Sequence, residues 1–212
     1  MKVVLFGSTG GTGKNVISKA LAAGHQVVAV ARKPEAVTAR HERLEVKAGD
    51  VLKLDTVAAA LDGADAVIST IGPTDEKNPG TLLSQGVGNI VVAMQQKKVA
   101  RFVFESGLMM SDGSDLGLLS RLGTRLVGSV LRKAMHDDKA IAEATILSSP
   151  LDWVIVRCPV LKHVPGTGRY VAGPRMRVNA LASLPHEDAA DCLVRALSET
   201  AWTKQIVNAG AN

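Results

Sequence analysis

The sequence predicts an α/β protein with a doubly wound parallel sheet. Apolar runs of strand length alternate along the chain with stretches of helical spacing, which is typical of a parallel sheet covered by helices on both faces. A glycine-rich turn over 7–13 separates the first apolar run from the first helical stretch. With 212 residues, we expect one domain over 1–212 with a small C-terminal lobe on the substrate side.

The elements of the first half follow from apolar runs and helical spacing. The run 2–6 has strand length, 14–23 is helical, and the run 26–31 is a second strand. A third strand over 43–48, a helix over 54–61 and a fourth strand over 64–71 continue the alternation. A helix over 83–97 follows from the helical spacing of Val87, Ile90, Val91 and Met94.

The second half contains both further strands and the two segments that depart from the alternation. Apolar runs predict strands over 101–105 and 153–157, a last helix over 186–197, and a short strand over 205–208 that could close the sheet edge. We interpret 107–134 as a lip over the pocket that leads into a helix continuing to 146. The irregular Gly- and Pro-containing segment 160–184 is expected to form the opposite wall.

The glycine turn predicts a dinucleotide site. Glycine permits dihedral angles that other residues avoid, and it lets the backbone approach a pyrophosphate closely. The amides that open the following helix then face the phosphates, and the helix dipole favours the negative charge. The residues expected to hold the cofactor here are Gly7, Thr9, Gly10, Gly11, Thr12 and Gly13.

The end of the second strand predicts which dinucleotide is bound. NAD-binding proteins of this kind carry an acidic residue there for the ribose 2′-hydroxyl. This chain instead has Arg32 and Lys33, and a guanidinium suits a 2′-phosphate. We therefore expect NADP(H), the alternative being that the two cations form a solvated strand end.

Ligands of doubly wound sheets sit at the carboxyl ends of the strands. At the end of the third strand, the carboxylate of Asp50 is expected to accept a hydrogen bond from the exocyclic amine of adenine, and Val51 is expected to pack on the adenine ring. At the fourth strand, Ile71 and Gly72 are expected against the ribose and pyrophosphate, although Gly72-Pro73 could be an ordinary turn. The fifth and sixth strands contribute Ser106, Pro159 and Val160.

Composition excludes several function classes. Hydrophobic residues make up 46% and aromatic residues only 3%, so the core is aliphatic and offers little on which bases could stack. We therefore expect the net charge of +5 to serve an anionic cofactor rather than nucleic acid. No apolar run is long enough to span a membrane, and the first run is too short for a signal peptide. Cys158 and Cys192 form no CxxC pair, which favours free thiols, no metal site and a cytoplasmic location.

Further motifs carry a family resemblance over nearly the whole chain. They are the glycine turn, Gly49-Asp50-Val51, 84–94, Ser106-Gly107, Asp137-Asp138-Lys139, and 151–157 followed by Pro159. With them the sequence resembles the atypical short-chain dehydrogenase/reductase family, with its Rossmann fold, and within it the NADPH-dependent flavin reductase and biliverdin-B reductase group. That group often has a histidine after the proline of the sixth-strand loop, where this chain has Val160, with His163 three residues later.

The resemblance also implies a set of catalytic positions. The wider family uses a serine, a tyrosine and a lysine, and here Ser106 and Lys139 match the serine and the lysine. The tyrosine position is Met135, which has no proton to donate; the flavin reductase group also lacks this tyrosine. Ser106 could instead be a turn cap, and Lys139 could instead pair with Glu143 one helical turn later. His136 could donate a proton, or it could be a solvated helix residue.

The sequence thus predicts an NADPH-dependent reductase of conjugated acceptors such as flavins, quinones or linear tetrapyrroles, acting by positioning. The resemblance favours a monomer. Two rivals remain: a non-catalytic NADP(H) sensor that regulates a partner through its basic lip, and a sugar-nucleotide or hydroxy-ketone enzyme, against which Met135 argues. Tyr170, the only tyrosine, could cover the acceptor or have a packing role.

Overall fold

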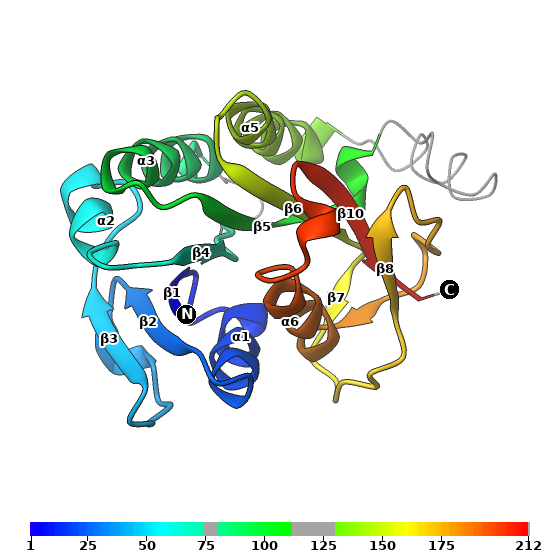
Figure 1. The fold of residues 1–212 in the computed structure, drawn as a ribbon. Helices are drawn as coiled ribbons and strands as arrows, with labels where there is room; N and C mark the ends of the chain where they lie inside the picture. The colour runs from blue at the N-terminus through cyan, green and yellow to red at the C-terminus, as the bar shows by residue number, and fades with distance from the viewer. Residues whose placement is uncertain (74–79, 112–129, 212) are drawn as a thin grey trace.

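The computed structural model describes residues 1–73, 80–111 and 130–211 (Figure 1). Its main sheet has the strand order β3-β2-β1-β4-β5-β6-β10-β8. Neighbouring strands are parallel except β8, which is antiparallel to β10. The strands of this sheet are β1 (Lys2–Phe6), β2 (Gln26–Ala31), β3 (Leu44–Ala48), β4 (Ala66–Ser69), β5 (Arg101–Gly107), β6 (Asp152–Cys158), β8 (Val171–Pro174) and β10 (Gln205–Gly210).

Helices cover both faces of the sheet, as the alternation predicts (Figure 1). On one face lie α1 (Gly11–Ala22) and α6 (His186–Arg195), and on the other lie α2 (Leu54–Ala60), α3 (Leu82–Lys97) and α5 (Val130–Leu147). Short 3-10 turns are η1 (Pro34–Ala36), η2 (Leu108–Met110) and η3 (Thr200–Trp202), and β7 (Leu161–Lys162) pairs with β9 (Leu184–Pro185) in a separate small sheet.

The core consists of two layers, one on each face of the sheet. Successive side chains of β1 point to opposite faces of the sheet and so contribute to both layers. Val3 and Leu5 pack toward α1 and α6, and Val4 and Phe6 pack on the opposite face. All four side chains are fully buried. A strand buried on both faces must be apolar throughout, which is why the sequence shows continuous apolar runs rather than alternation.

The predicted doubly wound fold is confirmed, and one part of the prediction is wrong. The strand at 205–208 does not close the sheet, because β10 lies between β6 and the antiparallel edge strand β8. Segment 160–184, expected to be irregular, contains β7, β8 and the first residue of β9. These strands are only two to four residues long. Gly173 and Pro174 interrupt the pattern of β8, and an edge strand tolerates proline because one of its sides is unpaired.

Helices α3 and α5 are joined by a buried carboxylate. Asp138 on α5 accepts hydrogen bonds from the amides of Leu83 and Ser84 in the first turn of α3, at 2.8 and 3.0 Å. The N-cap residue of α3, Thr81, makes no side-chain cap of its own. A side chain from another helix thus satisfies amides that the helix leaves without partners.

Candidate functional site

The candidate site lies where the strand order reverses, between β1 and β4, at the carboxyl ends of the strands. The glycine turn that follows β1 starts α1 at this point. The ends of β2, β3, β4 and β5 open on the same edge of the sheet, since all are parallel to β1 or to its neighbours. The topology therefore gathers the predicted site residues at one edge.

Two glycines of the turn are required by close backbone approach. Gly7 has a φ of +85°, and a Cβ on it would lie 2.6 Å from the backbone of Thr70 at the end of β4. A Cβ on Gly13 would lie 2.1 Å from the carbonyl oxygen of Gly7. Neither position admits a side chain, so the turn brings β1, β4 and α1 into backbone contact. This cradle fits a dinucleotide, whose pyrophosphate needs the same close approach.

The outer part of the turn is open. Thr9 and Gly10 are exposed, and Gly10 serves as the N-cap of α1 without a side chain to bond the first amides. The first turn of α1 contains no acidic residue. The opening amides of α1, which lack intrahelical acceptors, are thereby available to an anion.

The basic pair lies at the end of β2. The side chains of Arg32 and Lys33 are both exposed, and within the described residues neither has a hydrogen bond or an ion pair. Two exposed cations at the strand next to a glycine turn are suited to a second phosphate. The geometry is compatible with both of the alternatives that the sequence offers for this pair.

The expected adenine side is formed around Gly86 of α3. A Cβ on Gly86 would lie 3.0 Å from Val51 and 3.1 Å from Ile71, so this glycine lets the two side chains pack against the helix. Asp50 uses one carboxylate oxygen to accept from the amide of Leu52, at 3.0 Å. Gly72 is exposed, and a Cβ added to it would have nothing within 4 Å.

The hydroxyl of Thr12 points into the protein. Thr12 is only 3% exposed, donates to Glu105 Oε1 at 2.8 Å, and lies 2.9 Å from His186 Nδ1. The Thr12 hydroxyl is therefore engaged within the protein, and the predicted role of Thr12 in cofactor binding would use its backbone amide. Its side chain links α1 to the ends of β5 and α6 instead.

Glu105 was not predicted as a site residue. It is partly accessible, yet closely surrounded by protein, and burial raises its pKa to about 7 despite the hydrogen bond from Thr12 and the charge of Lys139, which both lower it. A carboxyl of this kind is about half protonated at neutral pH. The available signal in the sequence was a glutamate that ends an otherwise apolar strand.

Two histidines lie beside Gly11 in the first turn of α1. The rings of His163 and His186 have centroids 4.4 Å apart, and a Cβ on Gly11 would lie 2.7 Å from His163 and 2.8 Å from His186. His163 is exposed and His186 is half-buried. Burial and the neighbouring His163 lower the pKa of His186, so it is neutral at physiological pH. Nothing in the sequence predicts that these two histidines meet.

Ser106 belongs to a buried polar cluster on the opposite face of β5. Its hydroxyl donates to Glu143 Oε1 at 2.6 Å, and Arg157 pairs with Glu143 at 2.6 Å. Glu143 and Arg157 are 5% and 11% exposed at their side chains, so this ion pair is well shielded from solvent. Glu143, the alternative partner expected for Lys139, is thus engaged by Ser106 and Arg157. Lys139 lies beside Gly107, where a Cβ would be 3.7 Å from its Nζ.

The remaining residues singled out in the sequence differ in exposure and in their contacts. His136 is exposed, and its Nδ1 is 3.7 Å from Asp137. Pro159 is buried and Val160 is 70% exposed. Tyr170 has the packing role, since it packs against the core and its hydroxyl donates to Asp191 on α6 at 2.7 Å. Residue 135 lies in α5, but its side chain and the lip 112–129 fall outside the described part.

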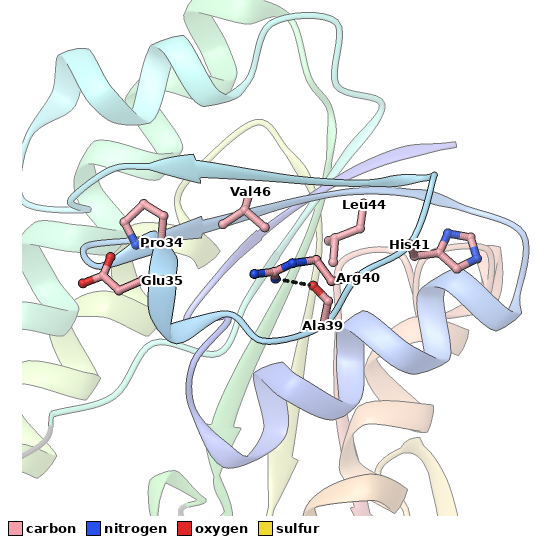
Figure 2. Close-up of a pocket in the computed structure, with 7 residues that line it drawn as sticks. All are labelled: Pro34, Glu35, Ala39, Arg40, His41, Leu44 and Val46. Carbon is pink, nitrogen blue, oxygen red and sulfur yellow. Dashed lines mark hydrogen bonds between the residues drawn. The ribbon is translucent and has the colours of Figure 1, made fainter.

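A separate groove of about 400 Å³ lies beside the edge strand β3 (Figure 2). It is lined by Pro34, Glu35, Ala39, Arg40, His41, Leu44 and Val46. Arg40 is folded back onto its own loop, where it donates to the carbonyls of Val37 and Ala39. None of the predicted cofactor or catalytic residues lines this groove. Within the described ranges, no group of His, Cys, Asp or Glu side chains is arranged to hold a metal, and no helix is long and apolar enough to cross a membrane.

Comparison with known proteins identifies the family. Residues 7–200 match the family model described as NAD(P)H-binding. The chain belongs to this family. A 3β-hydroxysteroid dehydrogenase/Δ5→4-isomerase of Mycobacterium tuberculosis is 34% identical over 116 residues, which cover 50% of this chain and 31% of that protein. The chain spans about a third of the length of the curated relatives it matches first.

Solved structures share the whole fold. The oxidoreductase ylbE of Lactococcus lactis has a TM-score of 0.81 at 22% identity, covering 100% of this chain and 91% of that one. ChuY, an anaerobilin reductase of Escherichia coli O157:H7, has a TM-score of 0.76 at 23% identity, with 99% and 97% covered. A short-chain dehydrogenase/reductase of Veillonella parvula in complex with NADP has a TM-score of 0.76 at 17% identity, with 99% and 94% covered. The predicted Rossmann fold and the atypical short-chain dehydrogenase/reductase resemblance are confirmed.

We predict that Gly13→Ala lowers both stability and affinity for NAD(P)H, because its new Cβ would meet the carbonyl of Gly7 at 2.1 Å. The loss of unfolding free energy is expected to exceed about 2 kcal/mol, as for other overpacked sites. Chemical denaturation and fluorescence titration with NADPH measure the two effects. The matched control is Gly88→Ala in α3, where nothing lies within 4 Å and helix propensity predicts stabilisation of about 0.5–1 kcal/mol. Equal stability of the two variants would contradict the close approach.

A second prediction concerns Glu105 and the dependence of stability on pH. The folded pKa of about 7 exceeds the ordinary value of 4.5, so between these values the folded state binds more protons and stability falls as pH rises. Glu105→Gln removes this loss. The variant should gain on the order of 1–3 kcal/mol relative to wild type at pH 8 compared with pH 5, measured by urea denaturation. A parallel pH dependence in both proteins would show that the carboxyl is not perturbed.

Proposed function

We propose that this protein is an NADPH-dependent reductase that transfers hydride to a conjugated acceptor, such as a flavin, a quinone or a linear tetrapyrrole, without a catalytic tyrosine. The observation that carries the proposal is the convergence at one sheet edge of the open glycine turn, the exposed Arg32 and Lys33, and Ser106. Family membership supports the nicotinamide cofactor. The name of ChuY supports a reductase reaction for this fold, and the NADP complex of the Veillonella parvula protein supports the phosphorylated cofactor.

Each part of the edge has a distinct task in this proposal. The opening amides of α1 hold the pyrophosphate, Arg32 holds the 2′-phosphate, and Val51 packs on the adenine. When bound, NADPH supplies the hydride. The proposal assigns the nicotinamide ribose to Lys139, whose ammonium lies beside Gly107 at the end of β5.

Ser106 is restricted to accepting hydrogen bonds from a ligand. Its single proton is donated to Glu143, whose other carboxylate oxygen pairs with Arg157 at 2.6 Å. The lone pairs of the hydroxyl remain available to an N–H or O–H group, such as the carboxamide of a nicotinamide or a ring N–H of an acceptor. Ser106 therefore orients a ligand and does not protonate it.

The segment after β6 supports an apolar acceptor. Val160, Val164 and Leu181 are 70%, 51% and 75% exposed. All three lie in the segment 160–184 that follows Pro159 and that is expected to form the wall opposite the lip. Exposed aliphatic groups beside a cofactor edge suit a planar conjugated molecule better than a sugar.

The proposal is tested by following NADPH oxidation by absorbance with FMN, a 1,4-naphthoquinone and biliverdin offered in turn, and with NADH in parallel. Turnover with NADPH well above NADH is the expected result. Tight NADPH binding without turnover on any acceptor would instead support the second candidate, a cofactor sensor. The absence of a tyrosine at Met135 is the feature that favours that candidate.

We predict that Arg32→Ala weakens NADPH binding by about tenfold or more while leaving NADH binding unchanged, because a charge-assisted contact to the 2′-phosphate is lost. Calorimetric titration with both cofactors measures this. Arg195→Ala, which removes an exposed arginine at the far end of α6, is the control for net charge. Unchanged NADPH affinity in Arg32→Ala would contradict the assignment.

A further inference from the structure

A continuous chain of four side chains connects the solvent to the end of β5. Glu105 accepts from the Thr12 hydroxyl at 2.8 Å, Thr12 Oγ1 lies 2.9 Å from His186 Nδ1, and the His186 ring lies against the exposed His163. The four residues come from β5, α1, α6 and the loop after β7. Two hydrogen-bonding contacts and one ring contact thus join four separate elements, and the last residue, His163, is exposed to solvent.

The polar groups of Glu105, Thr12 and His186 all have hydrogen-bond partners whether Glu105 is ionised or protonated. When Glu105 is ionised, Thr12 donates to it and accepts from the Nδ1–H tautomer of His186. When Glu105 is protonated, it donates to Thr12, and Thr12 donates to an unprotonated Nδ1. Both arrangements leave His186 neutral, in agreement with the lowered pKa of this residue. The two states differ in the proton on Glu105, in the direction of the hydrogen bonds and in the histidine tautomer.

The groups around Glu105 keep it close to its titration point. Lys139 on α5 stabilises the carboxylate by its positive charge, as does the hydrogen bond from Thr12 on α1. Burial opposes both, and Cys158 on β6, which feels the charge of Glu105, stays a neutral thiol because burial raises its own pKa. His186 on α6 is neutral. Glu105 therefore holds a proton in a large share of molecules near neutral pH.

We propose that Glu105 is the proton donor of the reduction and that Thr12, His186 and His163 form the relay that returns a proton to it. This inference rests on the proposed function and completes it, because a quinone that has taken up a hydride still needs one proton on oxygen. Glu105 directly precedes Ser106, at the edge where the acceptor is proposed to bind. It is partly accessible there, while Ser106 cannot donate.

The proton balance is complete. The O–H bond of Glu105 breaks, and its proton forms the new O–H bond of the reduced acceptor. His186 carries its proton at Nε2 at this point, so it first changes to the Nδ1–H tautomer by exchange with solvent as its ring turns beside His163. Glu105 then takes the proton of the Thr12 hydroxyl, Thr12 takes the Nδ1 proton of His186, and His186 takes one proton from solvent at Nε2, which restores the starting state. No oxidant or reductant beyond NADPH and the acceptor is consumed.

The test compares two acceptors that differ in their need for a proton. Reduction of a 1,4-naphthoquinone to the hydroquinone takes up a hydride and a proton, whereas the cation 10-methylacridinium takes up a hydride alone. Wild type, Glu105→Gln and Thr12→Val are assayed with both. Thr12→Val keeps the size of the side chain and the backbone amide, and it removes only the relay hydroxyl.

We expect Glu105→Gln to lose at least tenfold in kcat with the naphthoquinone and less than twofold with 10-methylacridinium. Thr12→Val should show a smaller loss of the same selectivity. The wild-type rate with the naphthoquinone should fall as pH rises above about 7, where Glu105 loses its proton, and this dependence should be absent in the Gln variant. Glu45→Gln on β3 and Thr145→Val on α5 are controls of the same chemistry outside the site.

A readout that is independent of turnover is the protonated-carboxyl band in infrared spectra of the protein without cofactor. Wild type should show a band that disappears with a midpoint near pH 7 and that is missing in Glu105→Gln. In Thr12→Val the band should persist to higher pH, because a hydrogen bond that stabilises the carboxylate is lost.

The outcomes separate the two levels of the proposal. Equal losses with both acceptors, or no loss with either in an active enzyme, would overturn the proton-donor role and leave the reductase function standing. An infrared midpoint near the ordinary value for glutamate would also overturn it. A wild-type protein that binds NADPH and reduces neither acceptor would overturn the reductase function, and with it the role of Glu105.

Discussion

The backbone contact between Gly13 and the carbonyl of Gly7 is the constraint on which the site depends. Because no Cβ intervenes, α1 begins directly above the end of β1, and its first amides open on the sheet edge. The same placement turns the Thr12 side chain inward, to within hydrogen-bonding distance of Glu105 on β5. A glycine requirement that is usually explained by phosphate binding thus also sets the geometry of the polar groups beneath the turn.

The alternation of β5 separates two polar systems that adjoin in sequence. Glu105 and Ser106 are neighbours, so their side chains point to opposite faces of the sheet. Ser106 meets the shielded pair of Glu143 and Arg157, which fixes its hydroxyl as a donor. Glu105 meets the titratable chain through Thr12. At the end of β5, the Ser106 hydroxyl can therefore accept a hydrogen bond from a ligand, and Glu105 can give a ligand its proton. In the proposed reaction, Glu105 thus takes over the proton transfer for which the family's tyrosine is missing.

The sequence was sufficient to predict the parts of the fold that rest on local patterns. Continuous apolar runs and helical spacing located the main strands and helices, and the glycine turn located the sheet edge. The prediction from sequence failed for short strands that form only because they pair with a distant strand. An example is β8, whose four residues include Gly173 and Pro174. The sequence could not predict the contacts of His163 and His186 with Gly11 or of Glu143 with Arg157, because those contacts depend on how α5, α6 and β6 pack. Glu105 could be recognised in the sequence as a glutamate at the end of an apolar run, but its burial could not be predicted.

The central claim is that one edge of the sheet holds NADP(H) and presents its reactive end to Glu105 and Ser106. A crystal structure of the complex with NADP⁺ tests this most directly. We expect the 2′-phosphate against Arg32, the pyrophosphate on the amides that open α1, and the nicotinamide beside the end of β5. A 2′-phosphate away from Arg32, or a nicotinamide directed away from the end of β5, would contradict the account.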